Sequence, residues 1–227
     1  MTIKRIKLDL VSGPGFLVKD NVISTELIDK IAERMPELHP VRASNHNIKY
    51  VESDKVAQMT DMAVWWSQQL NWEEIHAINH IVSPIVKLHL ETATLHQSNI
   101  LCINPFTNWI NPQIDTPHKF EAFNFDKRFL GIQVAIPIMK TESDMIGVFS
   151  SSQKVNFDIG LCYKGYYTEW FKQNCTRPLI KPGSIIFYNT RTLHSSMPNK
   201  SARPCHLLLM TYVDSDTIEH INRIGGT

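Results

Sequence analysis

Two segments of the chain carry side chains that can bind a metal ion and an organic acid. The first reads Gln113-Ile-Asp115-Thr-Pro-His118 and contains an amide, a carboxylate and an imidazole. The second contains His194 and, further along the chain, Arg203. Imidazole and carboxylate groups are good ligands for Fe(II), and a guanidinium group can bind a carboxylate through two parallel hydrogen bonds. These residue types predict a metal centre beside an arginine that holds a carboxylic acid.

The residues around His194 predict the hairpin that would position it. Pro182-Gly183 is a strong turn signal, and the apolar stretch Ser184–Tyr188 that follows is typical of a buried strand. His194 comes just after this stretch, and Arg203 comes just before the second strand-like stretch, Cys205–Val213. A hairpin with these limits can bring the histidine and the arginine to the mouth of one barrel.

This order of motifs resembles the C-terminal half of the Fe(II)- and 2-oxoglutarate-dependent oxygenases, especially the phytanoyl-CoA hydroxylase-like group. In that family a Pro-Gly turn, a strand, the distal iron-binding histidine, an asparagine and an arginine follow one another. The segment Gly15–Leu27 is similar to the strand and helix that open that group, so the resemblance covers roughly residues 15–213. It implies Fe(II) and 2-oxoglutarate as cofactors, His194 as the distal iron ligand, and Arg203 as the residue that binds the far carboxylate of 2-oxoglutarate.

The other part of the family's iron site, a His-x-Asp or His-x-Glu pair, is not intact here. In one alignment Gln113-x-Asp115 takes its place; side chains alternate along a strand, so both residues would face the same interior. In the other, His118 is retained and Phe120 replaces the acid. We favour the first, because a phenyl ring cannot replace a carboxylate ligand, whereas an amide oxygen is a weak donor. Asp115 and His118 both reaching the metal is a third arrangement, and an Asx turn at Asp115 with an exposed His118 is the reading without metal.

Charge and cysteine content exclude several other classes of protein. The chain has 23 basic and 22 acidic residues, a balance that argues against binding to nucleic acid or to an anionic membrane. No apolar run approaches the ~20 residues of a membrane-spanning helix. The cysteines form no CxxC pair, so we expect reduced thiols and a cytoplasmic protein. They are Cys102, Cys162, Cys175 and Cys205.

The arrangement of predicted elements indicates the α+β class. We expect a single domain over residues 1–227, with a helical N-terminal part over about 1–95 and a β-helix core over about 96–213. Helical spacing of apolar residues predicts helices that include 54–70 and 73–90, whereas the later apolar stretches are short and rich in β-branched and aromatic residues. We therefore predict a double-stranded β-helix (jelly-roll or cupin-like) core buttressed by N-terminal helices.

The sequence supports two hypotheses for function. The first is a non-haem Fe(II)/2-oxoglutarate-dependent dioxygenase that uses molecular oxygen to hydroxylate or otherwise oxidise a small organic substrate. The alternative is a non-catalytic binding protein on the same double-stranded β-helix that has lost its iron site. The aromatic-rich segment 150–176 is expected to loop over the mouth and shape the pocket in either case.

Overall fold

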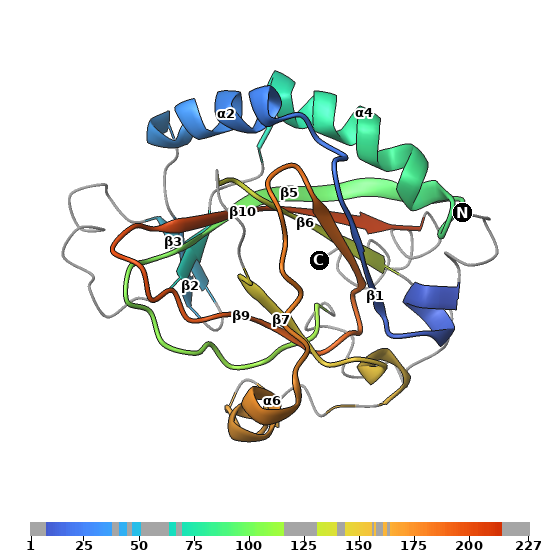
Figure 1. Cartoon of the computed structure of the whole chain (residues 1–227), viewed down its shortest axis with the longest axis vertical. Coiled ribbons are helices and arrows are strands. Elements are labelled where there is room, and N and C mark those ends of the chain that lie inside the picture. Colours follow the sequence, from blue (N-terminus) through green and yellow to red (C-terminus); the bar gives the residue numbers. More distant parts are fainter. Residues whose placement is uncertain are drawn as a thin grey trace.

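The computed structural model describes residues 8–37, 41–44, 47–50, 64–66, 70–115, 131–139, 144–155, 157, 161–162 and 164–214. They form a core rich in antiparallel sheet, with two longer helices, α2 (Thr25–Glu33) and α4 (Glu73–Lys87), on one side and the short helix α6 (Thr168–Asn174) on the other (Figure 1). The short helical turns are η1 (Leu8–Ser12), η2 (Met35–Glu37) and η4 (Ser152–Lys154). The α+β class and the jelly-roll-like core predicted from the sequence are thus confirmed.

The described strands belong to two sheets that face each other. The strands are β1 (Phe16–Lys19), β2 (Val41–Ser44), β3 (Asn47–Tyr50), β4 (Val64–Trp66), β5 (Thr94–Ile103), β6 (Gly131–Pro137), β7 (Ile146–Val148), β8 (Ile185–Asn189), β9 (His194–Ser196) and β10 (Cys205–Val213). The larger sheet has the order β1-β8-β6-β10-β5-β4-β2-β3, and the smaller sheet pairs β7 with β9. Figure 1 shows the helices α2 and α4 over one face of the larger sheet and the smaller sheet below its other face.

Alternation along the strands assigns their residues to two apolar layers. On β10, Leu208, Met210 and Tyr212 pack in the cluster that contains the buried faces of α2 and α4. Leu207 and Leu209 point the other way, into a second cluster that includes Val148 of the smaller sheet. Because successive side chains of a strand point to opposite faces, the second cluster marks the space between the two sheets. This inner face is where the predicted site residues would have to point.

A capping residue and regularly spaced apolar residues explain where α2 and α4 form. Ser24 caps α2, its Oγ accepting a hydrogen bond from the backbone N–H of Leu27 at 3.3 Å. The apolar residues of α4 recur every three or four positions and are buried against the sheet. Pro84 lies in the last turn of α4, which continues to Lys87, so the helix is neither split nor ended at the proline.

The N-terminal part contains strands as well as helices, which corrects one prediction. Residues 64–66, within the predicted helix 54–70, form strand β4 and pair with β5, with Trp65 opposite Cys102. Valine and tryptophan favour a pleated, half-buried surface, and the edge of β5 supplies the hydrogen-bond partners. The larger sheet thus extends beyond the predicted core over 96–213. No helix among the described residues is long and apolar enough to span a bilayer.

Candidate functional site

Backbone pairing brings the two predicted motifs together. Gln113 and His194 exchange two backbone hydrogen bonds, Gln113 N–H to His194 O at 2.8 Å and His194 N–H to Gln113 O at 2.9 Å. The N–H of Asp115 donates to the carbonyl oxygen of Thr190 at 2.8 Å. The segment 113–115 therefore runs alongside the turn that follows β8, and its position does not depend on any metal–ligand bond.

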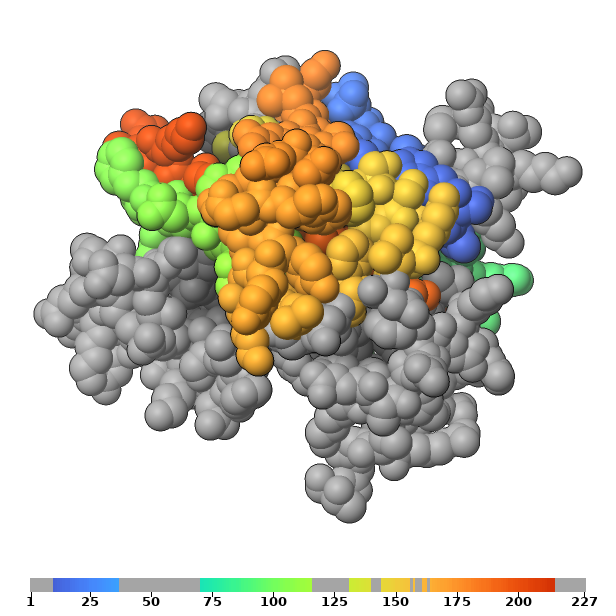
Figure 2. Space-filling model, turned by 90° about the horizontal axis from the view of Figure 1, so that it is seen from below, coloured from blue at the N-terminus to red at the C-terminus, as the bar shows by residue number. Residues whose placement is uncertain are grey.

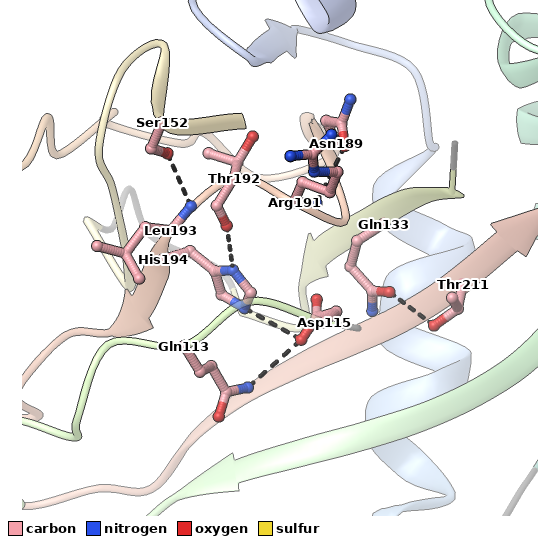
Figure 3. Close-up of polar contacts among 10 residues, drawn as sticks. All are labelled: Gln113, Asp115, Gln133, Ser152, Asn189, Arg191, Thr192, Leu193, His194 and Thr211. Atoms are coloured by element: carbon pink, nitrogen blue, oxygen red, sulfur yellow. Dashed lines mark hydrogen bonds and ion pairs between the residues drawn. The ribbon is translucent and has the colours of Figure 1, made fainter. Parts of the chain in front are cut away.

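The side chains of Gln113, Asp115 and His194 converge on one point (Figure 3). Asp115 Oδ1 lies 3.4 Å from His194 Nε2 and 3.4 Å from Gln113 Nε2. Positions 113 and 115 share a face as predicted, because the Gln113 amide reaches the Asp115 carboxylate. His118 lies outside the described residues. Among those residues, no group of three or more histidine, cysteine, aspartate or glutamate side chains could hold a metal ion.

Hydrogen bonding fixes which nitrogen of His194 faces Asp115. Nδ1–H donates to the carbonyl oxygen of Thr192 at 2.9 Å, which leaves Nε2 directed at the carboxylate. Burial disfavours a charged ring, but the negative charge of Asp115 and the hydrogen bonds to Asp115 and Thr192 outweigh it and raise the pKa of His194 above its ordinary value. The raised pKa favours a proton on Nε2 in the metal-free protein, and a metal ion can replace that proton.

The turn that carries His194 is held at several points from outside. Ser152 Oγ accepts the N–H of Leu193 at 2.8 Å, and Thr192 Oγ1 donates to the carbonyl oxygen of Gly15 at 3.0 Å. Gly15 has a φ of 85°, and a Cβ at this position would lie 2.3 Å from Gln153 Oε1. A left-handed residue packed this closely requires glycine. Gly15, which directly precedes β1, therefore supports the turn that carries His194.

Helix α6 supports the site from the side opposite α2 and α4. Phe171 of α6 is fully buried in a cluster with Ile114 and Leu193, which directly precede Asp115 and His194 in the chain. These apolar neighbours point toward α6, while Asp115 and His194 point inward. In Figure 2, which views this side of the molecule, the orange segment that contains α6 covers much of the described surface. The aromatic residues of the predicted loop thus include core residues that back the metal-ligand candidates.

Three polar residues that the sequence did not single out lie opposite one another on neighbouring strands of the larger sheet, and one of them contacts His194. The ring of Tyr188 on β8 packs against His194 with 4.6 Å between ring centroids. Burial and the charge of Asp115 raise the pKa of Tyr188 well above its ordinary value, so the phenol keeps its proton. Tyr188 lies opposite Gln133 of β6, which lies opposite Thr211 of β10. Gln133 is a polar residue in the middle of an otherwise apolar strand, and that was the available signal.

Arg203 does not join this group of side chains. It is exposed in the turn before β10, and its carbonyl oxygen accepts a hydrogen bond from Asn199 Nδ2 at 2.7 Å. Asn199 also donates to the carbonyl oxygen of Ile103 at 3.1 Å, so the asparagine ties the turn to the end of β5. A second arginine, Arg191, lies half-buried in the turn between Thr190 and His194. The assignment of Arg203 as the residue that binds 2-oxoglutarate stays a prediction.

Comparison with known proteins identifies the fold through solved structures. No family model matches the chain, and no curated protein matches it by sequence. The epimerase SnoN of nogalamycin biosynthesis, in complex with Fe³⁺, alpha ketoglutarate and nogalamycin RO, is similar with a TM-score of 0.68 and 13% identity over 94% of this chain and 84% of SnoN. HygX from Streptomyces hygroscopicus, with nickel, 2-oxoglutarate and hygromycin B bound, gives a TM-score of 0.65 and 10% identity over 95% of this chain and 88% of HygX.

A third enzyme, the non-haem alpha ketoglutarate-dependent carbocyclase SnoK, has a TM-score of 0.65 and 13% identity over 95% of this chain and 85% of SnoK. The chain therefore has the fold of Fe/2-oxoglutarate-dependent oxygenase-type enzymes that act on small-molecule natural products. Identities of 10–13% carry the fold and not the activity.

Proposed function

We propose that the protein is a non-haem Fe(II)/2-oxoglutarate-dependent dioxygenase that hydroxylates or otherwise oxidises a small organic substrate. The observation that carries the proposal is the pairing of the Asp115 carboxylate with the His194 imidazole across the inner face of this fold. The Pro182-Gly183 turn and the Gly15 segment favour the phytanoyl-CoA hydroxylase-like group. Localisation in the cytoplasm is part of the same proposal.

Two strong donors and one weak donor would hold a divalent iron ion here. Asp115 Oδ1 and His194 Nε2 would be the strong ligands, and the Thr192 carbonyl holds the histidine in the tautomer that metal-bound histidines adopt. The amide of Gln113 would present its Oε1 in place of Nε2 after rotation about its last torsion. His118 is the other candidate for the third position. When bound, iron with 2-oxoglutarate and oxygen supplies an oxidant that removes hydrogen from a substrate carbon.

Buried residues around the histidine keep this centre rigid. Tyr188 packs against one face of the His194 ring, and Val148 and Ile186, both fully buried, fill the interior behind it. Side chains locked by packing hold ligands within the small tolerance that a metal centre needs.

A small organic substrate is supported by the structural neighbours. SnoN was solved with nogalamycin RO and HygX with hygromycin B, and both complexes also contain a metal and 2-oxoglutarate. We extend this to the present chain as a class of ligand only.

An anaerobic visible spectrum tests the proposal. The purified protein is loaded with Fe(II), and 2-oxoglutarate is then added; a new charge-transfer band is expected, because the keto acid chelates the metal. His194→Ala should abolish the band, whereas His96→Ala, which removes an exposed histidine on β5, should not. A band that survives His194→Ala would refute the assigned ligand.

The rival function, a non-catalytic binding protein, is favoured by two observations. Gln113 stands where a strong ligand is expected, and Arg203 is exposed. This rival predicts no band and no stabilisation of folding by Fe(II) and 2-oxoglutarate together, whereas ligands that bind the folded state raise its unfolding free energy.

A further inference from the structure

Residues 10–15 form an N-terminal strap that is held by the turn at η4. Gln153 Nε2 donates to the carbonyl oxygens of Val11 at 3.3 Å and of Gly13 at 3.0 Å. Ser151 also reaches the strap, its Oγ donating to Gly13 O at 3.1 Å and its N–H to Pro14 O at 2.7 Å. In Figure 2 the blue N-terminal segment lies beside the yellow segment that contains η4. Backbone acceptors of the strap are thus bonded to a turn that is distant in the chain.

The strap is also bonded to the turn that carries His194. Asn189 Nδ2 donates to the carbonyl oxygen of Leu10 at 3.2 Å. The carbonyl oxygen of Gly15 accepts both the N–H of Asn189 at 2.9 Å and Thr192 Oγ1 at 3.0 Å. Asn189 and Thr192 are buried, so water does not compete for these hydrogen bonds. The strap therefore joins η4 to the turn over residues 189–194.

Gln153 is placed to couple these two contacts. Its side chain is 4% exposed, and the two carbonyl acceptors fix the orientation of the amide, because only Nε2 can donate to them. Among the residues that the structure describes, no N–H or O–H group donates to Oε1. A Cβ on Gly15 would lie 2.3 Å from Oε1, so a Cα–H of Gly15 points at this oxygen, which is a weak contact. The preceding residue, Ser152, accepts the N–H of Leu193. Two consecutive residues of η4 thus hold the strap and the residue before His194.

We infer that Gln153 is a positioning residue for His194, and that it couples docking of the N-terminal strap to the geometry of the metal-ligand candidates. The role as a metal ligand rests on the proposed function, whereas the coupling through the strap does not. A ligand must be held within about 0.5 Å of its working position, so a looser strap should weaken metal binding at His194. Coupling between two sites is reciprocal, so metal binding should in turn stabilise the contacts of the strap.

Two variants that remove hydrogen bonds to the strap test the inference. Gln153→Met keeps an unbranched side chain of similar length and removes the amide. Thr192→Val removes the hydroxyl that donates to Gly15 O and keeps the shape of the side chain. The matched control is Ser184→Ala, because the fully buried Ser184 Oγ donates to Asp20 Oδ1 at 2.8 Å and ties the other end of the β1–β8 pair.

Metal affinity and amide hydrogen exchange are measured for each variant. Calorimetry gives the Kd of Ni(II), which replaces iron so that no turnover occurs. Hydrogen exchange of the metal-free protein is followed at the amides of Gln113 and His194, which bond each other's carbonyl oxygens, with the amides of β5 and β10 as the internal reference. Exchange reports local opening as distinct from global unfolding. Urea unfolding shows that each variant is folded.

The Kd of Ni(II) should rise about tenfold in Gln153→Met and in Thr192→Val, at the lower end of the range for groups that orient a metal ligand. The amides of Gln113 and His194 should exchange about 3- to 10-fold faster relative to β5 and β10, as expected for one lost hydrogen bond. Ser184→Ala should change neither quantity. In the unmodified protein, saturating Ni(II) should slow exchange of the Ser151 amide, and Gln153→Met should remove this effect.

The outcomes separate the inference from the proposed function. An unchanged Kd of Ni(II) in both variants, with faster exchange confined to Ser151, shows that Gln153 holds the strap alone and overturns the inference. An equal loss of nickel affinity in Ser184→Ala also overturns it, because the effect then follows global stability. If the unmodified protein binds no Ni(II), the metal centre is refuted. Faster exchange at Gln113 and His194 in Gln153→Met then still supports the positioning of His194, and unchanged exchange overturns it.

Discussion

Replacement of Gln113 by histidine should strengthen metal binding. The substitution restores a His-x-Asp pair at a position whose backbone is already fixed by two hydrogen bonds to His194. Little is lost with the amide, because its 3.4 Å contact with Asp115 is longer than the 2.7–3.2 Å of ordinary N–H···O hydrogen bonds. Gln113 is half-buried, so the imidazole ring fits without displacing fully packed side chains.

Ligand chemistry sets the size of the expected gain in metal affinity for Gln113→His. An imidazole nitrogen is a far better donor to Ni(II) or Fe(II) than an amide oxygen. Loss of groups that merely orient a ligand costs about 10- to 100-fold in metal affinity, so a gained ligand should contribute about 100-fold. That factor equals about 2.7 kcal/mol of binding free energy.

Titration of the purified protein with Ni(II), followed by calorimetry, measures this change. Gln173→His is the matched control, because it adds a histidine at an exposed position of α6 away from Asp115. Gln113→Leu should weaken Ni(II) binding about tenfold if the amide oxygen is a ligand. An unchanged Kd in Gln113→His refutes the assignment of position 113. If Gln113→Leu also has no effect while His118→Ala weakens binding, the alternative alignment is right.

Four further predictions concern pH and the residues that support the site. In the metal-free protein the raised pKa of His194 stabilises the fold at pH values below the unfolded-state pKa of about 6.5, and this stabilisation is lost as the pH rises through the folded-state pKa. Urea unfolding at a series of pH values should show this decrease in unfolding free energy. In His194→Gln the unfolding free energy should depend less on pH. Because Ni(II) must displace that proton, its affinity should rise by up to about tenfold per pH unit until the ring is neutral. Gly15→Ala should cost at least about 1–2 kcal/mol of unfolding free energy, since its φ of 85° is left-handed. Phe171→Ala should lower the unfolding free energy by about 3–5 kcal/mol and weaken metal binding, because this buried ring packs against Ile114 and Leu193. An unchanged metal affinity would show that α6 does not support the site.

The sequence predicted the parts of the site that depend on local signals. The Pro182-Gly183 turn, the apolar strand after it and the final strand over 205–213 all lie where periodicity and turn residues indicated. Positions 113 and 115 share a face because alternation is a property of any extended segment. Strand pairing between distant segments could not be predicted from local patterns. Val64–Trp66 lies in a segment whose apolar residues have helical spacing, but it forms a strand that pairs with β5.

The same limit explains Arg203 and Gln133. The spacing between His194 and Arg203 limits how far the arginine can reach but does not determine which way its side chain points. In the structure Asn199 holds the turn so that Arg203 is exposed. Gln133 is visible in the sequence only as one polar residue among apolar neighbours. Its link to Tyr188 and Thr211 depends on the register of three strands that are distant in the chain, and register is set by tertiary packing.

The backbone of the site bears on whether a metal centre has been lost or altered. The hydrogen bonds that join Gln113 to His194 and Asp115 to Thr190 use main-chain atoms alone, so the segment would stay in place with any side chain at 113. His194 is buried, its Nδ1 is fixed by Thr192 and its Nε2 faces a carboxylate. A proton or a metal ion between Nε2 and the carboxylate offsets the cost of burying such a pair. The nickel affinities of the residue-113 variants decide between a metal centre with a weak third ligand and a binding protein without metal.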